Sequence, residues 1–474
     1  MGVKRFILIG TALISFICIE AQQAWSLQKC VETAKQNSIA IKQNELNIES
    51  AKNNTIATRH SRYPSFSGST TFRSNFGRTI DPTTNDFNNQ TISNNSWGIN
   101  SGIPLFNGGS ITNSIKQADI NYQTSKLDAE QYAADLALTV VQYYLGIIYA
   151  QERLDNARIQ AQTTTEQLNQ VNKLIAAGNR PEGDRLDILA QQAKDEQNII
   201  SFTNTVNTNK LALKQLLRLP IDQAFEIERP APDALQPSVH NENLSEIYKY
   251  ALENRNDIKS GQLKIKSAEY GLKIDKASGL PTVNMGGSVG SVWSSQGQRL
   301  AGFKDVSNQT TVIFNGQSTT LTVINKVPYT ESNPYTSQLN QNFNYGFGVQ
   351  MNVPIYNNYR VRAQLKRDEL NIENEKLKAE QIKETLKNNI QTVLNDLKAA
   401  QNTYEAARRS TEASRNAYNN TKIKFDLGSA NTFELTSSKN KLDIAVTEEL
   451  LSRFDYIFKS KVLDYYLGRP IQLN

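Results

Sequence analysis

The chain has 474 residues, an apolar fraction of 38% and a formal charge of +6, which results from 52 basic and 46 acidic residues. The two signs are mixed along the sequence, which argues against a nucleic-acid-binding protein because such proteins gather Lys and Arg on one surface. The low apolar fraction argues against one large globular core, so the length suits two or three domains or one elongated molecule.

Residues 1–21 are predicted to be a signal peptide. Lys4 and Arg5 precede an apolar run over residues 6–19, and Ala21 supplies the small residue that suits cleavage. We therefore expect export of the protein and removal of this segment. The run is shorter than the roughly 20 residues that a spanning helix needs, and no later apolar run is as long, so any membrane-spanning part would have to consist of strands.

The rest of the chain is a tandem duplication. The segment LQKCVETAKQNSIAIKQNELNIESA from Leu27 resembles LSEIYKYALENRNDIKSGQLKIKSA from Leu244, and the same offset aligns Pro64 with Pro281. A longer offset then aligns IPLFNGG with VPIYNNY, so the second copy has extra residues. We expect a first repeat over 22–219, a linker over 220–243 and a second repeat over 244–474. The linker is rich in proline, at Pro220, Pro230, Pro232 and Pro237.

Each repeat is predicted to begin with a helix that leads into a strand. Residues 27–59 have apolar side chains at helical spacing, and Pro64 ends this helix because a proline disfavours helix at the preceding residue. The strand that follows has Phe66, Phe72 and Phe76 on one face. Its counterpart in the second repeat has Val283, Met285, Val289 and Trp293.

A polar loop is predicted after the first strand of each repeat. In the first repeat it covers residues 78–95, and in the second it is longer, over 294–341, and holds most of the extra residues. A second strand then returns, over residues 97–103 in the first repeat. The four prolines predicted to mark the junctions between strands and helices are Pro64, Pro104, Pro281 and Pro354.

The last strand, over residues 343–353, alternates strictly between large apolar residues and residues that are polar or glycine. Its apolar residues are Phe343, Tyr345, Phe347, Val349, Met351 and Val353. A strand of about 9–12 residues is long enough to cross a bilayer when tilted, and this alternation is typical of an outer-membrane barrel with a wet interior. The alternative is an ordinary half-buried sheet that packs on the helices.

Four strands in one chain cannot close a barrel, and lipid does not tolerate open sheet edges. The chain is therefore expected to form oligomers if its strands span a membrane. Two copies would give eight strands and three would give twelve, and the strand pattern does not choose between them.

A very long helix is predicted after each pair of strands. Over residues 136–175 and 386–425, apolar or small residues recur at alternating steps of four and three, which is the heptad pattern of a coiled coil. The first of these helices, over 108–177, would be roughly 105 Å long at 1.5 Å per residue. Gly178 and Gly428 suit the C-terminal caps, and shorter helices return from them.

The sequence contains none of the motifs that would indicate an enzyme. There is no G-x-x-x-x-G-K-[ST] loop for an ATPase and no hydrolase context for Ser, His and Asp. His60, His240 and Cys30 have no metal-ligand spacing. Cys18 lies in the signal peptide, in a context that fits a lipoprotein signal poorly. We therefore expect no catalysis, no cofactor, no metal and no nucleic-acid partner, and the energy for export would have to come from a partner protein.

Taken together, these features are similar to the TolC family of outer-membrane efflux channels, over residues 27–470. The resemblance rests on the duplicated unit, on PLFNGG and its echo PIYNNY, and on the two glycine turns AAGNRPEGDRLDIL and DLGSANTFELTS. It implies an α+β membrane protein that forms a homotrimer. Four transmembrane strands from each chain would build a twelve-stranded barrel, continued by a periplasmic tunnel of long antiparallel coiled-coil helices with the linker 220–243 at its equator.

The resemblance also implies a function. The protein would be the passive exit duct of a tripartite efflux or secretion system in the outer membrane of a Gram-negative bacterium. Its partners would be outer-membrane lipid, a periplasmic adaptor protein and an inner-membrane pump of the RND type. The substrate could be a drug, a metal or a protein. The alternative function is that of a structural or adhesive coiled-coil protein of the periplasm or cell surface, without a channel.

The resemblance locates a gate at the turns of the long helices. Relatives have Tyr three residues before the second turn glycine, Arg two after it, and acidic residues six and nine after it. Those positions here hold Phe425, Ala430, Glu434 and Ser437, and the first repeat has Ile175, Arg180, Asp184 and Asp187. The carboxylates have thus partly moved to the other hairpin. A ring of them from three chains would attract cations, whereas Asp184 and Glu434 could equally serve as helix caps, where a carboxylate favours the dipole. The candidate gate residues are Arg180, Asp184, Asp187, Phe425 and Glu434.

Overall fold

The computed structural model describes residues 24–80, 85–89, 91–230 and 243–469. The expected signal peptide, with Cys18, lies outside the described residues, as do His240 and most of the linker. The chain divides into two compact units, which are described in turn. Unit 1 comprises residues 1–50, 123–263 and 376–474, and unit 2 comprises residues 51–122 and 264–375.

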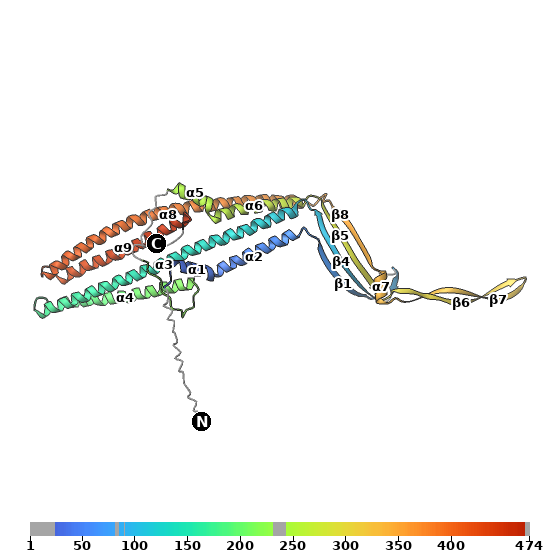
Figure 1. Cartoon of the computed structure of the whole chain (residues 1–474), viewed down its shortest axis with the longest axis horizontal. Coiled ribbons are helices and arrows are strands. Elements are labelled where there is room, and N and C mark those ends of the chain that lie inside the picture. Colours follow the sequence, from blue (N-terminus) through green and yellow to red (C-terminus); the bar gives the residue numbers. More distant parts are fainter. Residues whose placement is uncertain (1–23, 81–84, 90, 231–242, 470–474) are drawn as a thin grey trace, which may run out of the picture. The chain divides into compact units, whose positions relative to one another are not determined.

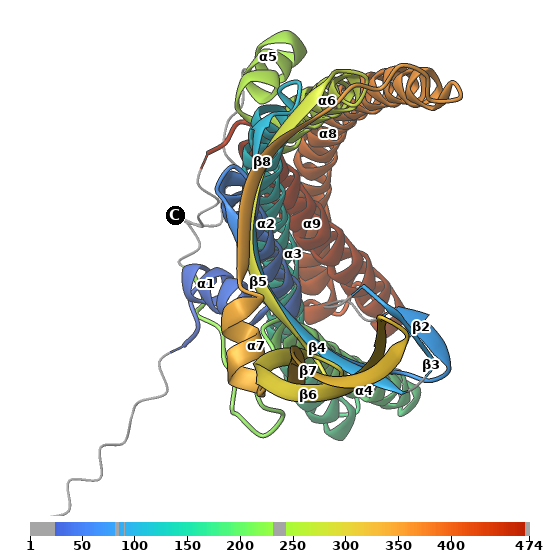
Figure 2. The same cartoon turned by 90° about the vertical axis from the view of Figure 1, so that its right-hand side faces the viewer.

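Unit 2 contains a four-stranded antiparallel sheet to which each repeat contributes two strands (Figure 1). Its strands are β1 (Ser65–Asn75), β4 (Ile92–Phe106), β5 (Thr282–Ser294) and β8 (Asn344–Asn352), in the order β1-β4-β5-β8. The sheet is curved, as Figure 2 shows. Within the described residues, β1 and β8 each pair with one neighbouring strand of this sheet, so both of its edges are open.

The register places the apolar residues of all four strands on one face of this sheet. Residues directly opposite each other on antiparallel strands share a face, and Ile99 lies opposite Val289, which lies opposite Tyr345. The same face carries Phe66, Phe72, Trp97, Ile103, Met285, Trp293, Phe347, Val349 and Met351. The other face carries mostly Ser, Thr, Asn, Gln and Gly together with Arg73, and its apolar residues are Ile92, Pro104 and Val292. Helix α7 (Tyr335–Gln341) packs on the apolar face at one end, where Tyr335 contacts Trp293. Away from that end many of the apolar side chains are exposed, including Phe66 at 76% and Phe347 at 91%.

The predicted loop over 294–341 is wrong, because most of it is regular structure. It contains a long two-stranded ribbon of β6 (Gln298–Phe314) and β7 (Gln317–Ser332), followed by α7 (Tyr335–Gln341). Asn315 and Gly316 have φ angles of 54° and 79°, as a tight hairpin turn requires. The prediction failed because it treated Thr and Asn as loop formers, although Thr favours strands. The loop over 78–95 likewise contains β2 (Arg78–Ile80), β3 (Phe87–Asn89) and the start of β4.

One of the predicted junctions is also corrected. Pro64 and Pro281 directly precede β1 and β5, and Pro354 lies two residues after β8. Pro104, by contrast, lies inside β4, which continues to Phe106 through a register shift beside the proline. A proline cannot donate a ladder hydrogen bond, and such irregularities accommodate it.

Unit 1 is helical, and its main elements are two helical hairpins. One consists of α3 (Ser110–Ala176) and α4 (Gly183–Leu216), and the other of α8 (Arg360–Asp426) and α9 (Thr432–Tyr466). The starts of α3 and α8 belong to unit 2. The two 67-residue helices agree with the predicted long coiled-coil helices.

The predicted single helix over 27–59 is divided in both repeats. In the first, α1 (Leu27–Asn37) and α2 (Ile39–His60) meet at Ser38, which has an extended backbone and accepts a hydrogen bond from the amide of Ile41. In the second, α5 (Leu244–Asn254) and α6 (Asn256–Ala277) meet at the extended Arg255. The break was not predicted because the helical spacing of apolar residues continues across Ser38 and Arg255.

The largest apolar cluster of unit 1 packs the middle of α3 against α1, α4 and α9. It includes Val140, Tyr144, Ile147, Leu213 and Ile457, and Trp25, which forms a β-bridge with Ile227. Among the described helices, α3 alone contains a stretch apolar enough to cross a membrane by length and composition. The burial of its apolar residues in this cluster explains that composition as core packing.

Candidate functional site

The two helical hairpins end in turns of the same construction. Gly178 and Gly428 have φ angles of 75° and 76°, a left-handed conformation in which a side chain would be strained. The amide of Gly178 donates to Ile175 O, and that of Gly428 to Phe425 O, at 2.9 and 3.0 Å. These bonds, together with those of the following residues, satisfy the last carbonyl groups of α3 and α8. The duplicated sequence therefore builds one kind of turn twice.

The two returning helices begin differently. Asn431 caps α9, since its side chain accepts a hydrogen bond from the amide of Glu434 at 2.8 Å and donates one to the Glu434 carboxylate at 3.1 Å. Glu434 is exposed and lies in the first turn, where its charge favours the helix dipole. In α4 the cap residue Glu182 makes no side-chain capping bond, and Asp184 lies in the first turn. Glu434 is thus part of a helix cap, as one of its two predicted roles requires.

Arg180 joins the two turns. Its guanidinium donates to the backbone oxygens of Phe425 and Ala430 at 3.3 and 2.8 Å, and lies 3.5 Å from an oxygen of Asp184. It also lies over the ring of Phe425, with Cζ 4.5 Å from the ring centroid. A cation beside the last carbonyl groups of a helix is favoured by the helix dipole. Arg180 therefore links the first hairpin to the C-terminal end of α8.

Phe425 is a core residue of this region and is only 1% exposed. It belongs to an apolar cluster that both hairpins build, with Val171 and Ile188 from the first and Tyr418, Ala430 and Leu435 from the second. The hydroxyl of Tyr418 accepts a hydrogen bond from Gln167 at 2.8 Å. Of the five candidate gate residues, the structure brings Arg180, Asp184 and Phe425 into contact. Asp187 and Glu434 are exposed on α4 and α9.

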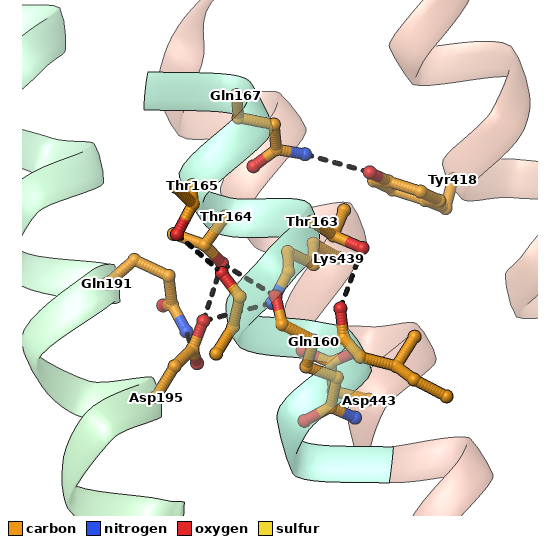
Figure 3. Close-up of polar contacts among 12 residues, drawn as sticks. Gln160, Thr163, Thr164, Thr165, Gln167, Gln191, Asp195, Tyr418, Lys439 and Asp443 are labelled. Atoms are coloured by element: carbon orange, nitrogen blue, oxygen red, sulfur yellow. Dashed lines mark hydrogen bonds and ion pairs between the residues drawn. The ribbon is translucent and has the colours of Figure 1, made fainter. Parts of the chain in front are cut away.

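A buried cluster of charged residues links the same hairpins further along (Figure 3). Lys439 of α9 and Asp195 of α4 have side chains that are 3% and 2% exposed, and their charged atoms are 3.5 Å apart. Asp195 also accepts hydrogen bonds from Thr164 at 2.5 Å and Gln191 at 2.8 Å. Lys439 makes a second ion pair with Asp443 at 2.9 Å. Burial raises the pKa of Asp443, and Lys439 opposes this shift.

The heptad prediction missed this cluster because it counted apolar and small residues only. A Lys and an Asp at inward-facing positions of two predicted helices would have been the signal, since such residues are seldom fully buried without a partner. Both hydrogen bonds and ion pairs satisfy Asp195 here. The cluster fixes the relative position of α4 and α9 within unit 1.

A groove of about 340 Å³ lies between α4 and α9 beside this cluster. Its lining mixes apolar and polar side chains and includes charges of both signs: Arg153, Lys194, Asp195, Asp443 and Glu448. Among the described residues, no group of three or more His, Cys, Asp or Glu side chains is placed to hold a metal ion.

The predicted lipid-facing residues lie together on one face at the edge of the sheet. Tyr345, Phe347, Val349 and Met351 alternate along β8 and are 62–91% exposed. Phe343 and Val353 flank the strand and are about half exposed, at 49% and 50%. In the isolated chain this row forms part of the exposed apolar face of the sheet.

Comparison with known proteins shows both family and fold. A family model described as outer membrane efflux protein matches residues 30–217 and 247–469, which is most of the chain. An uncharacterized protein of Haemophilus influenzae is 25% identical over 241 residues, which are 50% of this chain and 50% of that protein. The chain thus matches about half the length of that curated relative.

Solved outer-membrane channels have the same fold over nearly the whole chain. The structure of CusC, described in terms of transmembrane channel formation, has a TM-score of 0.75 and 15% identity, over 94% of this chain and 92% of that one. The outer membrane protein VceC of Vibrio cholerae has a TM-score of 0.72 and 13% identity, over 94% and 96%. The open state of the MtrE outer membrane channel of Neisseria gonorrhoeae has 0.71 and 16%, over 94% and 90%.

Proposed function

The chain belongs to the outer membrane efflux protein family, and on this basis we propose that it is the outer-membrane exit duct of a tripartite efflux or secretion system. It would pass substrates passively from an inner-membrane pump, through the periplasm, to the outside. The protein is located in the outer membrane and extends into the periplasm, as the fold it shares with solved outer-membrane channels supports.

The observation that carries this proposal is the amphipathic four-stranded sheet. Its apolar face is largely exposed along four strands of 9–15 residues, and its other face is mainly polar or glycine. Such a sheet suits a wall with lipid on one side and water on the other. An adhesive protein in water would leave this face uncovered, which disfavours that alternative.

The open edges of the sheet support an oligomer, and the resemblance to the TolC family makes a homotrimer the proposed form. Backbone N–H and C=O groups on β1 and β8 would lack partners in lipid, so β8 of one copy would pair with β1 of the next. Three copies with four strands each would form a closed barrel of twelve strands, with room for a lumen. The helical hairpins of three copies would form the periplasmic tunnel.

The partners proposed are a periplasmic adaptor and an inner-membrane pump of the RND type. The groove between α4 and α9 is the proposed contact for an adaptor helix, because its lining combines charges of both signs with the apolar side chains of Phe202 and Ile444. The entrance would lie at the hairpin turns, where Asp187 and Glu434 are exposed and Arg180, Asp184 and Phe425 hold the turns together.

Single cysteines along residues 343–353 test the proposal. In outer-membrane vesicles, cysteines at the even positions should react with a water-soluble thiol reagent, and those at the odd positions should not. The purified protein should also conduct ions across planar bilayers. Equal labelling at odd and even positions, without conductance, would support the alternative of a coiled-coil protein whose strands lie in water.

A further inference from the structure

Arg73 is the only charged residue on the four strands of the curved sheet, all of which the structure describes. Strands β1, β4, β5 and β8 contain 11, 15, 13 and 9 residues, and apart from Arg73 none of these is Asp, Glu, Lys, Arg or His. In the whole chain 21% of the residues are charged. The near-absence of charge is therefore a property of this sheet, and Arg73 is its one exception.

The register places Arg73 on the polar face of the sheet. It lies opposite Asn94, which lies opposite Ser294, one residue along each strand from the apolar-face residues Phe72 and Trp293. Helix α7 packs on the apolar face, and Figure 2 shows this helix on the convex side of the sheet. Arg73 consequently lies on the concave side. In the proposed trimer the concave polar face lines the water-filled lumen.

Arg73 also lies near the end of the sheet that is remote from the long helices. Strand β1 begins at Ser65, directly after the junction with α2, and Arg73 is two residues from its last residue, Asn75. Because the helices extend into the periplasm, this end of the sheet is its extracellular end. Arg73 therefore lies at the outer mouth of the proposed lumen.

The lumen wall between the helices and Arg73 is bare as well as uncharged. On the polar face Gly98 lies opposite Gly290, and Gly102 lies opposite Gly286, which lies opposite Gly348. A glycine has no side chain that could reach into the lumen. No side chain on this part of the wall can therefore select ions by charge.

The neighbouring elements do not neutralise Arg73. Its side chain is exposed, and it makes no ion pair with another described residue. In the trimer β1 would pair with β8 of the next copy, and β8 and the preceding α7 contain no charged residue. Among its described residues, the hairpin after β1 adds one charge of each sign, Arg78 and Asp86. At the base of the β6–β7 ribbon Arg299 is paired with Glu331 at 2.7 Å.

We propose, on the basis of the trimeric channel proposed above, that Arg73 from three copies forms a ring of positive charge that sets the ion selectivity of the extracellular mouth. A guanidinium group stays charged at every physiological pH. Like charges around an opening with low-dielectric walls focus their field into it, which concentrates ions of the opposite sign. The ring would attract anions to the outer mouth and repel cations that approach from outside.

Reversal potentials across planar bilayers in a low-salt KCl gradient test this ring. Arg73→Ala should raise the permeability ratio of K⁺ to Cl⁻ by about two-fold or more, since a potential of only about one kT already changes local ion concentrations by that much. Arg73→Lys keeps the charge and should keep the wild-type ratio. Lys304→Ala is the matched control, because it removes an exposed cation from the β6–β7 ribbon, outside the lumen wall.

The same recordings separate failure of the ring from failure of the channel. Arg73 is exposed, so Arg73→Ala should retain the trimer mass in detergent and form open channels. An unchanged permeability ratio in such channels would overturn the ring and leave the exit duct in place. An equal change in Lys304→Ala would also overturn the ring, because charge outside the wall would then set the selectivity. A wild-type protein that is monomeric and conducts no ions would overturn the proposed channel itself.

Discussion

The guanidinium group of Arg180 lies on the ring of Phe425, with Cζ 4.5 Å from the ring centroid, and so joins the first repeat to the second at the hairpin turns. The same group donates to the backbone oxygen of Ala430 at 2.8 Å. Arg180 thus covers a buried aromatic residue and satisfies backbone acceptors beside it. The two turns belong to different repeats, and the Arg180 side chain links them.

Arg180→Ala should loosen the turns. It removes hydrogen bonds from a charged donor, each worth about 1.5–3 kcal/mol, and uncovers the Phe425 ring. We expect faster cleavage at the turns by a protease that cuts beside apolar residues. Arg185→Ala is the control, because Arg185 lies on the same hairpin and is 45% exposed. Equal cleavage of the two variants would contradict the linking role of Arg180.

Lys439→Met should strongly destabilise the helical unit. The substitution leaves Asp195 buried without its cation, and loss of one partner from a buried ion pair costs about 3–5 kcal/mol. Thermal unfolding in detergent, followed by circular dichroism, should show a clear drop in Tm. Lys441→Met, on an exposed position of the same helix, is the control. If Asp195→Asn is added to Lys439→Met, the combined loss should be smaller than the sum of the single losses, because the two residues interact.

Cys30 should be inert in the folded protein. It is 0% exposed, and burial raises the pKa of its thiol from 9.0 to about 12, although Lys29 acts in the opposite direction. The folded state therefore keeps a proton that the unfolded chain releases, so stability should fall as the pH rises from 9 towards 12. A thiol reagent at pH 8 should modify the wild-type chain at this site only after denaturation. Cys30→Ser provides the baseline, and rapid native labelling above it would show that the site opens.

The sequence predicts those features of the fold that depend on periodicity. Alternation located β8, and heptad spacing located α3 and α8 to within a few residues, because each pattern follows directly from strand or helix geometry. The apolar face of the four-stranded sheet was predicted strand by strand. The register that unites those strands was not, since it depends on pairing between the two repeats.

What the sequence could not predict depends on contacts between distant residues. The sequence predicts a loop where the β6–β7 ribbon lies, because polar side chains such as Thr, Ser and Asn occur both in exposed strands and in turns. The Asp195–Lys439 pair brings together residues of different repeats. The gate at the turns stays a prediction from the family resemblance, and the burial of Phe425 beneath Arg180 follows from packing between the two repeats, which no local sequence pattern reveals.

The three carboxylates proposed for the entrance should contribute unequally to cation block of the channel. Asp184 lies 3.5 Å from Arg180, so its charge is largely compensated, whereas Asp187 and Glu434 are exposed. In planar bilayers, Asp187→Asn combined with Glu434→Gln should therefore weaken block by divalent cations, and Asp184→Asn should change it little. Exposed carboxylates in a ring from three chains would reinforce one another, and this effect should shrink at high salt because counterions screen it. A larger effect from Asp184→Asn than from the double variant would show that the entrance is lined by the other side of the turn.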